Sequence, residues 1–242
     1  MSAKELLVKI LTFGFYSTKW RCNACGKENF NGKFFCDECE SKLPYNDKAT
    51  CEHCGRALKA AANYCSTCKE RLVSVDKARS VFIYDKPIST LIKNAKYRNR
   101  RFVFDYFSDK LAVYLTEKFG DAEAVTFVPA TEKRVKARGF NQSELLAKGV
   151  AEKSGVPFVD CVIKKEETER QAKLSKSDRL KNLKGAFKVR DKNLVRGKNI
   201  VVIDDVSTTG ATGETIAETL KKAGALRVYL LTVASVPPKN GF

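Results

Sequence analysis

The sequence of 242 residues has only one histidine, one tryptophan and one methionine, and it has no long apolar run. A membrane-spanning helix needs roughly 20 consecutive apolar residues, and no segment approaches that length. An apolar stripe lies between Leu6 and Phe13, but Lys9 interrupts it and no small-residue cleavage site follows. We therefore expect an amphipathic helix at this end, no membrane span, no export signal and a cytoplasmic protein.

The net charge of +17 is unevenly distributed along the chain. Residues 1–76 carry 12 basic and 9 acidic side chains, whereas residues 77–242 carry 33 and 19. A basic domain attracts polyanions such as phosphates and nucleic acid. A solvated, lysine-rich surface would give the same composition, and charge alone does not distinguish the two.

Eight of the nine cysteines form four Cys-x-x-Cys pairs, and the second four repeat the first at an offset of 29 residues. Two such turns supply four thiolates in a tetrahedral arrangement, which suits Zn²⁺ at roughly 2.3 Å. A cytoplasmic location disfavours disulfides, and the ribbon spacing favours zinc over an iron–sulfur cluster. We predict two closed, structural zinc sites. Neighbouring pairs sharing one zinc is the simplest arrangement, and a crossed arrangement stays open. The predicted ligands are Cys22, Cys25, Cys36, Cys39, Cys51, Cys54, Cys65 and Cys68.

Three residues of the cysteine-rich segment, and the ninth cysteine farther along the chain, also carry predictions. Gly26 and Gly55 follow the second cysteine of a turn, where a positive φ is often needed. His53 lies within the Cys51–Cys54 turn, and because four thiolates already complete the site we expect it on the solvent side. Cys161 lies in an apolar stretch and is interpreted as a buried small hydrophobe.

Strand and helix patterns alternate after residue 76. Apolar runs predict strands over residues 80–84, 124–129, 200–203 and 228–233, and helical spacing marks 88–97, 102–119, 141–153 and 214–223. Such alternation indicates an α/β domain with a parallel sheet and helices on both faces. We therefore divide the chain into an N-terminal helix with a double zinc ribbon, residues 1–76, and an α/β domain, residues 77–242.

The segment after the predicted strand 200–203 contains the candidate ligand-binding residues of this domain. Ligands of parallel sheets bind at the carboxyl ends of strands, and here a loop over residues 204–213 precedes a helix. Backbone N–H groups at a helix N-terminus favour an anion, threonine hydroxyls add donors, and Gly210 allows close approach to a phosphate. Asp204 and Asp205 are unsuited to phosphate but suited to accepting hydrogen bonds from two ribose hydroxyls. A capped helix start would explain one aspartate and one threonine, but not the whole string.

Residues 201–212 closely resemble the signature of type I phosphoribosyltransferases. The segment 138–147, which begins Arg-Gly-Phe-Asn-Gln, resembles the hallmark of the ComF family, the competence-associated phosphoribosyltransferase-like proteins. Gln171, Leu174, Arg179, Asn182 and residues 185–187 are similar to that family's middle region, and the paired cysteines are similar to its double zinc ribbon. The resemblance extends from about residue 22 to 234.

The resemblance implies a site for phosphoribosyl pyrophosphate (PRPP) with Mg²⁺. Asp204 and Asp205, the implied catalytic pair, would receive the ribose hydroxyls, and residues 208–212 would hold the 5′-phosphate. Residues 128–134 would form the pyrophosphate loop, although Ala130 and Thr131 replace the Val-Pro found in many relatives. The implied PRPP-binding residues are Val206, Ser207, Thr208, Thr209, Gly210, Ala211, Thr212, Ala130, Thr131, Lys133 and Arg134.

A basic stretch over residues 93–102 interleaves cations with Tyr97 and Phe102. Such a pattern suits single-stranded nucleic acid, but ordinary surface side chains and contacts to PRPP phosphates are alternatives. The candidate nucleic-acid-binding residues are Lys93, Lys96, Arg98, Arg100 and Arg101.

Two functions follow from the resemblance and the motifs. The first is a PRPP-binding protein of DNA uptake in natural transformation, which handles single-stranded DNA with a translocation helicase. The second is a metabolic phosphoribosyltransferase that acts on an unidentified nucleobase or amine. No purine- or pyrimidine-reading motif identifies an acceptor, and the sequence does not show that a reaction is catalysed.

Overall fold

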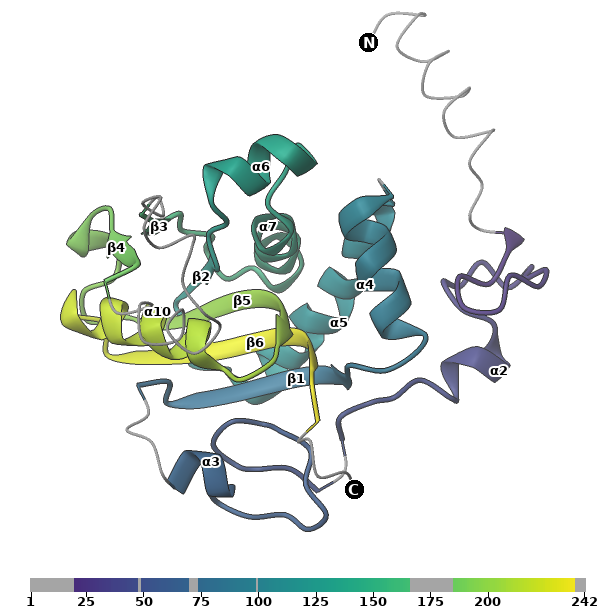
Figure 1. The fold of residues 1–242 in the computed structure, drawn as a ribbon, viewed down its shortest axis with the longest axis horizontal. Coiled ribbons are helices and arrows are strands. Elements are labelled where there is room, and N and C mark those ends of the chain that lie inside the picture. The colour runs from purple at the N-terminus through teal and green to yellow at the C-terminus, as the bar shows by residue number, and fades with distance from the viewer. Residues whose placement is uncertain (1–19, 48, 70–73, 99, 166–184, 238–242) are drawn as a thin grey trace, which may run out of the picture. The chain divides into compact units, whose positions relative to one another are not determined.

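The computed structural model describes residues 20–47, 49–69, 74–98, 100–165 and 185–237, and the chain forms two compact units (Figure 1). The first unit comprises residues 1–43 and contains the first four cysteines, with the short helix α2, Asp37–Glu40. The second comprises residues 44–242 and contains the other four cysteines, the helix α3, Ser66–Lys69, and the sheet. The second cysteine set therefore folds together with the α/β domain.

Four parallel strands form the main sheet in the order β1-β6-β5-β2. Their bounds are Lys77–Ile83 for β1, Arg227–Ser235 for β6, Asn199–Ser207 for β5 and Ala124–Phe127 for β2. The central strands β5 and β6 are buried apolar runs, as expected for strands covered on both faces. The predicted parallel α/β fold is confirmed.

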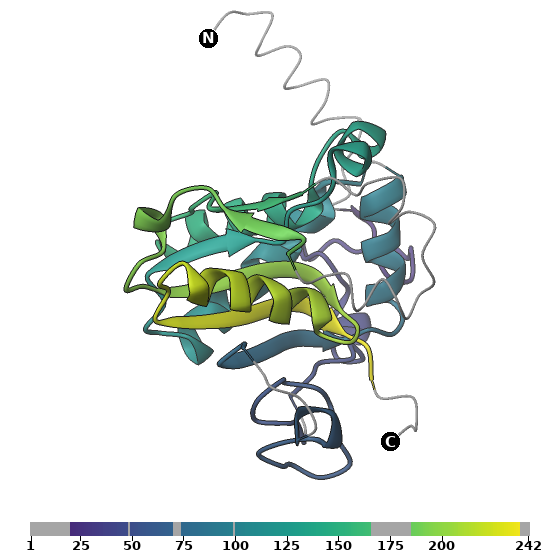
Figure 2. The same ribbon diagram turned by 60° about the vertical axis from the view of Figure 1, so that its left-hand side comes forward.

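Helices cover both faces of this sheet (Figure 2). The helix α10, Ala211–Lys222, packs against β6 on one face, and Ile216 and Leu220 join Ile200 and Val202 in its core. Residues that alternate with these along β5 point to the other face, where α5, Phe102–Lys118, and α7, Gln142–Ser154, pack against the sheet. The helix α4, Ile88–Tyr97, packs on α5 through an apolar face.

Several short elements were not predicted. The helix α6, Glu132–Arg138, contains no buried residue, which explains why it lacks a periodic apolar signal. A two-stranded antiparallel sheet joins β3, Val162–Lys164, to β4, Phe187–Val189, and a 3₁₀ turn, η2, follows at Lys192–Leu194. The predicted N-terminal helix and the family-like residues between 166 and 184 lie outside the described residues.

Three smaller predictions are settled by the structure. Gly26 and Gly55 have φ of 74° and 64°, as predicted. Cys161 is fully buried in the core beside α10, and its thiol lies 3.4 Å from the Thr126 hydroxyl, which confirms a structural role. The prediction for His53 was wrong: it is 9% exposed, because its ring stacks on Tyr64 and its turn packs on β1.

No helix in the described ranges combines the length and the apolar character needed to cross a bilayer.

Candidate functional site

Asp204 and Asp205 lie at the carboxyl end of β5, between two neighbouring strands. The sequence predicted that the loop begins at Asp204, but β5 continues to Ser207 because Asp204, Val206 and Ser207 still pair with β6. Both carboxylates are therefore held by a central strand instead of a loop. Asp205 is buried, with 5% of its surface exposed. This is the position where parallel sheets bind ligands.

The Asp204 carboxylate accepts two hydrogen bonds on one oxygen. The Ser143 hydroxyl donates at 2.8 Å, and the Asp205 backbone N–H donates to the same Oδ1 at 2.8 Å. Ser143 is fixed at the start of α7, where the Asn141 side chain accepts its N–H at 3.1 Å. Burial, with the neighbouring charge of Asp205, raises the pKa of Asp204 to about 7, although these two hydrogen bonds act against the shift. Asp204 therefore changes charge near neutral pH.

Asp205 forms an ion pair with Lys96 from α4. We predicted Lys96 on a nucleic-acid-binding surface, but its side chain is only 18% exposed and faces the carboxylates. Buried Ile92 and Ala95 attach this face of α4 to the protein, which brings Lys96 to the end of β5. Lys96 thus belongs to the same site as the two aspartates.

The loop after β5 has the geometry of an anion site. Gly210 takes a φ of 77° immediately before α10, a left-handed conformation that disfavours other residues. The Ala211 N–H donates to the Thr209 hydroxyl at 3.4 Å. The other N–H groups of a first helical turn have no acceptor within the helix and favour an anion. Residues 206–213 line a hollow together with Asp204, Leu230 and Thr232. Hydroxyl and N–H groups of the loop and the residue Asp204 therefore surround one small space.

The predicted pyrophosphate loop joins β2 to α6. Because β2 pairs in parallel with β5, this connection leaves the sheet at the carboxyl ends of the strands, where the aspartates lie. The Asn141 amide donates to the Val128 carbonyl at 3.2 Å, which ties the connection to the start of α7. Ala130 and Thr131 are half-buried in it, whereas Lys133 and Arg134 are exposed on α6.

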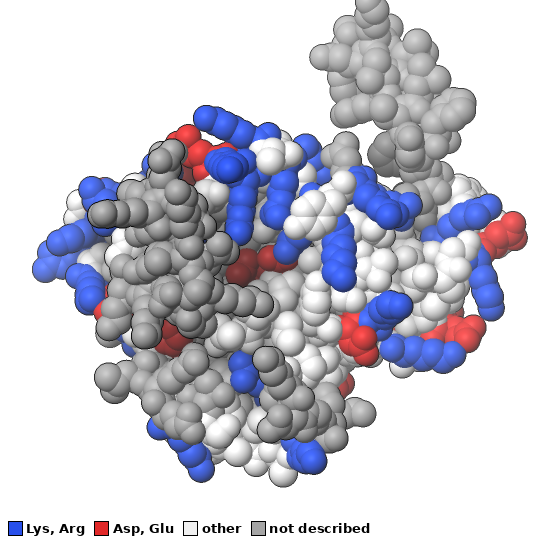
Figure 3. Space-filling view, viewed as in Figure 1, with Lys and Arg blue, Asp and Glu red and all other residues white. Residues whose placement is uncertain are grey.

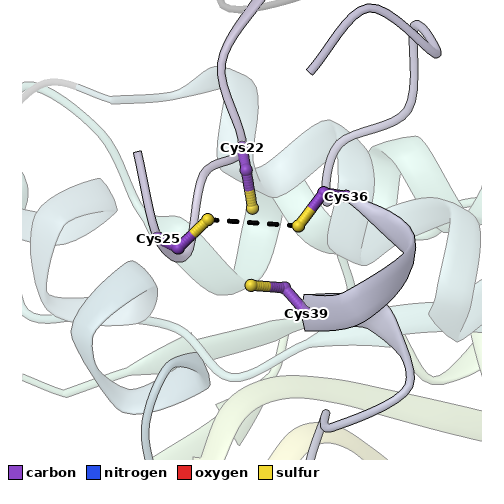
Figure 4. Close-up of side chains that lie close together, drawn as sticks. All are labelled: Cys22, Cys25, Cys36 and Cys39. Atoms are coloured by element: carbon purple, nitrogen blue, oxygen red, sulfur yellow. Dashed lines mark hydrogen bonds between the residues drawn. The ribbon is translucent and has the colours of Figure 1, made fainter. Parts of the chain in front are cut away.

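Each four-cysteine set brings its sulfurs together, and neighbouring pairs share a set. Figure 4 shows the first set, Cys22, Cys25, Cys36 and Cys39. All four sulfurs of a set lie within 4.8 Å of one another. The Cys25 and Cys36 sulfurs are 4.0 Å apart, and those of Cys54 and Cys65 are 3.8 Å apart. A tetrahedral site with 2.3 Å zinc–sulfur bonds has sulfurs about 3.8 Å apart. The two sets therefore fit two zinc ions, with the pairing that we considered simplest.

The surroundings of the sulfurs shift the pKa of individual thiols in both sets. Burial favours the neutral thiol of Cys22, but backbone hydrogen bonds outweigh it and lower the pKa of Cys22 to about 6. Burial and the neighbouring charges of Cys51 and Cys65 raise the pKa of Cys54 to about 12. Four close thiolates repel one another, and a bound dication removes that cost.

Comparisons with known proteins match both parts of the chain. Residues 140–241 match the phosphoribosyl transferase domain family, and residues 16–69 match the double zinc ribbon family. Competence protein F of Haemophilus influenzae is 30% identical over 166 residues, which cover 66% of this chain and 72% of that protein. The chain belongs to the ComF family. Competence protein ComFC of Bacillus subtilis is 29% identical over 60% of this chain and 58% of its own length. The DNA utilization protein YhgH of Escherichia coli is 31% identical over a region that covers 61% of this chain and 66% of that protein.

The ComF-family chain also carries a basic surface near the aspartates. Lysine and arginine side chains gather over α6 and the neighbouring ends of α4 and α5, with acidic side chains in the hollow below them (Figure 3). Lys93, Arg98, Arg100 and Arg101 are exposed, as is Tyr97.

Two arginine–aromatic contacts join the parts of this surface. The Arg138 guanidinium lies 5.0 Å from the Tyr97 ring centre and donates to its hydroxyl at 3.0 Å, while Arg101 lies 4.6 Å from the Phe140 ring centre. The unpredicted helix α6 is thereby linked to the stretch at 93–102.

Sequence reasoning missed Ser143 as a functional residue of this ComF-family site. The signal was present, because Ser143 lies inside the hallmark segment 138–147. The contact itself was not readable, since Ser143 and Asp204 are 61 residues apart in the chain.

Proposed function

We propose that this ComF-family protein binds PRPP with Mg²⁺ at the end of β5 and acts in DNA uptake. In that role it handles single-stranded DNA together with a translocation helicase. One observation carries the proposal: two carboxylates, positioned by Ser143 and Lys96, border a loop that ends in a helix N-terminus. Few ligands other than a sugar phosphate need hydroxyl acceptors and an anion site so close together.

Asp204 and Asp205 accept hydrogen bonds from the ribose 2′- and 3′-hydroxyls in this proposal. The short link from Ser143 keeps Asp204 oriented, and Lys96 keeps the Asp205 charge balanced until a ligand arrives. The N–H groups and hydroxyls of residues 208–212 hold the 5′-phosphate at the start of α10.

The pyrophosphate lies toward the connection between β2 and α6. Ala130 and Thr131 contribute backbone there, and Lys133 and Arg134 offset the charge of the phosphates from the exposed face of α6. Mg²⁺ arrives with PRPP, since it commonly binds phosphate oxygens and few protein groups. Electrostatic stabilisation of departing pyrophosphate is the contribution these residues would make to a transfer reaction.

The DNA part of the proposal is supported by the basic surface and by the relatives. Two of these relatives are described as competence proteins and a third as a DNA utilization protein. The surface combines Arg98, Arg100 and Arg101 with an aromatic ring, Tyr97, that is 68% exposed. Backbone charge and ring stacking are the two means by which proteins hold single strands without reading sequence. Lys96 is not part of this surface, because it pairs with Asp205.

Calorimetric titration of PRPP with Mg²⁺ into the zinc-loaded protein tests the ligand site. We expect saturable binding that is lost in an Asp204→Ala/Asp205→Ala variant, and such loss would justify a search for an acceptor. The same variant should still bind single-stranded DNA. If the unaltered protein does not bind PRPP, the fold is a scaffold without this ligand. DNA binding and partner recognition then become the favoured functions.

A further inference from the structure

The second cysteine set lies directly against the loop that follows β5. Both belong to the compact unit formed by residues 44–242. The guanidinium of Arg56, two residues after Cys54, donates to the Thr208 carbonyl at 3.1 Å. His53, Cys54, Arg56 and Cys68 also line one cavity together with residues 207–210. The loop proposed to hold the phosphate therefore has a cysteine-rich wall.

The backbone of Arg56 is part of the Cys51–Cys54 turn. The Cys51 N–H donates to the Arg56 carbonyl at 2.9 Å, and the Gly55 N–H donates to the Cys51 carbonyl at 2.9 Å. Both bonds close the turn that presents the thiolates of Cys51 and Cys54. Any change that opens this turn therefore moves Arg56.

The turn is also fixed to the sheet. The His53 carbonyl accepts the Ala78 N–H at 2.7 Å, and the Asn46 amide donates to the Gly55 carbonyl at 2.7 Å. A side chain at Gly55 would collide with the Ala78 carbonyl, so the two backbones need a glycine to approach this closely. The backbone that carries the Arg56 side chain is thus fixed to β1.

A second contact supports the loop at its other end. The Glu214 carboxylate, in the first turn of α10, accepts the Ser74 N–H at 2.5 Å and the Val75 N–H at 3.2 Å. These residues lie between the second cysteine set and β1. The loop is therefore supported at Thr208 and at Glu214 by residues adjacent to one cysteine set.

We infer that Arg56 is a positioning residue for the phosphate loop, and that metal at the second cysteine set and PRPP at this loop favour each other's binding. The inference rests on the proposed function for its ligand, but the contact between Arg56 and Thr208 does not. Four sulfurs within 4.8 Å need a cation to balance thiolate repulsion, and its loss opens the turn that carries Arg56. Coupling of this kind is reciprocal. The first cysteine set belongs to the other unit, and its turns do not carry Arg56, so it provides the comparison for this coupling.

An Arg56→Ala variant tests the positioning role, with Lys59→Ala as the matched control on an exposed residue of the same segment. The quantities to measure are the zinc content, the PRPP affinity by calorimetry, and amide hydrogen exchange over residues 206–213. The expected result is unchanged zinc, affinity weaker by about tenfold, and faster exchange in the loop for Arg56→Ala alone. Wild-type affinity and exchange in Arg56→Ala would overturn the inference.

A pair of cysteine variants tests the coupling to metal. Cys54→Ser and Cys25→Ser should each lower the zinc content by one ion, but only Cys54→Ser should weaken PRPP binding and loosen the loop. Equal effects, or none, would refute the coupling. If the unaltered protein binds no PRPP, the proposed function fails, and hydrogen exchange in Arg56→Ala still decides whether Arg56 positions the loop.

Discussion

Lys96 of α4 forms an ion pair with the buried carboxylate of Asp205 at the end of β5. Asp204 lies beside this pair, and its pKa of about 7 means that much of it stays protonated near neutral pH. The positive charge of Lys96 and the proton that Asp204 retains both reduce the negative charge of this site. Two adjacent carboxylates are tolerated here because Lys96 pairs with one of them and burial favours protonation of the other.

Replacing Lys96 by alanine should destabilise the protein. The change leaves the Asp205 charge buried beside Asp204 without its partner, and removing one member of a buried pair costs about 3 kcal/mol of unfolding free energy. Urea unfolding measures the difference. Lys93→Ala, an exposed lysine of the same helix, should stay within about 0.5 kcal/mol of wild type. Equal losses in both variants would contradict a special role for Lys96.

Stability should depend on pH through Asp204. Its folded-state pKa is raised by burial and by Asp205, so between about pH 4 and 7 the native state holds a proton that the unfolded state has released. This contribution is complete below pH 4 and is lost as the pH rises through 7. The Asp204→Asn variant has no carboxyl group to titrate at this position, so it does not lose this contribution as the pH rises. Its unfolding free energy relative to wild type should therefore increase between pH 5 and 7.5. Parallel curves for the two proteins would rule out the raised pKa.

Removing the Ser143 hydroxyl should weaken PRPP binding without preventing folding. Ser143→Ala deletes the 2.8 Å bond that orients Asp204 and that stabilises its charged form. A hydrogen bond to a charged group corresponds to a loss of about tenfold in affinity. Calorimetry checks this, with Ser154→Ala at the other end of α7 as the control. An unchanged affinity in Ser143→Ala would mean that Asp204 needs no such support.

The basic surface should determine the salt dependence of DNA binding. Each phosphate contact to a single strand contributes about 0.7 to the slope of log affinity against log salt. Arg100→Ala/Arg101→Ala should therefore reduce the slope by about 1.4 and weaken binding. Fluorescence anisotropy with a labelled oligonucleotide measures both. Lys188→Ala, an exposed position on β4, should leave the slope unchanged. If Lys188→Ala has the same effect, DNA binding follows total charge and not this surface.

Zinc content should follow the pairing of neighbouring cysteine turns. The purified protein should contain two zinc ions per chain, because each set supplies four close sulfurs. Cys39→Ser should lower this to about one, whereas Cys161→Ser should retain both, since Cys161 lies in the apolar core. Metal analysis after gel filtration gives the counts. Loss of both ions in Cys39→Ser would indicate that the two sites form together.

The sequence predicted those features of the fold that depend on local patterns. The apolar run at 200–203 and the spacing from 88 to 97 correspond to β5 and α4 because each buries a regular face. The cysteine ligands followed from spacing, since thiolate turns work over short distances. The short helix α6 and the extension of β5 to Ser207 were missed, because α6 buries no residue and the extension depends on pairing with β6.

Contacts between distant segments were the part that could not be predicted. Lys96 looked like one of several surface cations, and only the packing of α4 brings it to Asp205. Arg56 and Thr208 are 152 residues apart, and no local pattern relates them. His53 was expected on the solvent side because four thiolates complete the metal site without it, but the turn packs on the sheet.

The second cysteine segment also protects the sheet from other chains. The strand β1 lies at the edge of the main sheet, with β6 on its only strand-paired side among the described residues. Residues before this strand bond to its open side: Pro44 and His53 accept N–H groups of Ile83 and Ala78, and the Asn46 N–H donates to Val81. An uncovered edge strand recruits further strands and leads to aggregation. A chain that begins at Asp76 would expose this edge and should self-associate, so we expect the metal-binding segment to limit association of the α/β domain.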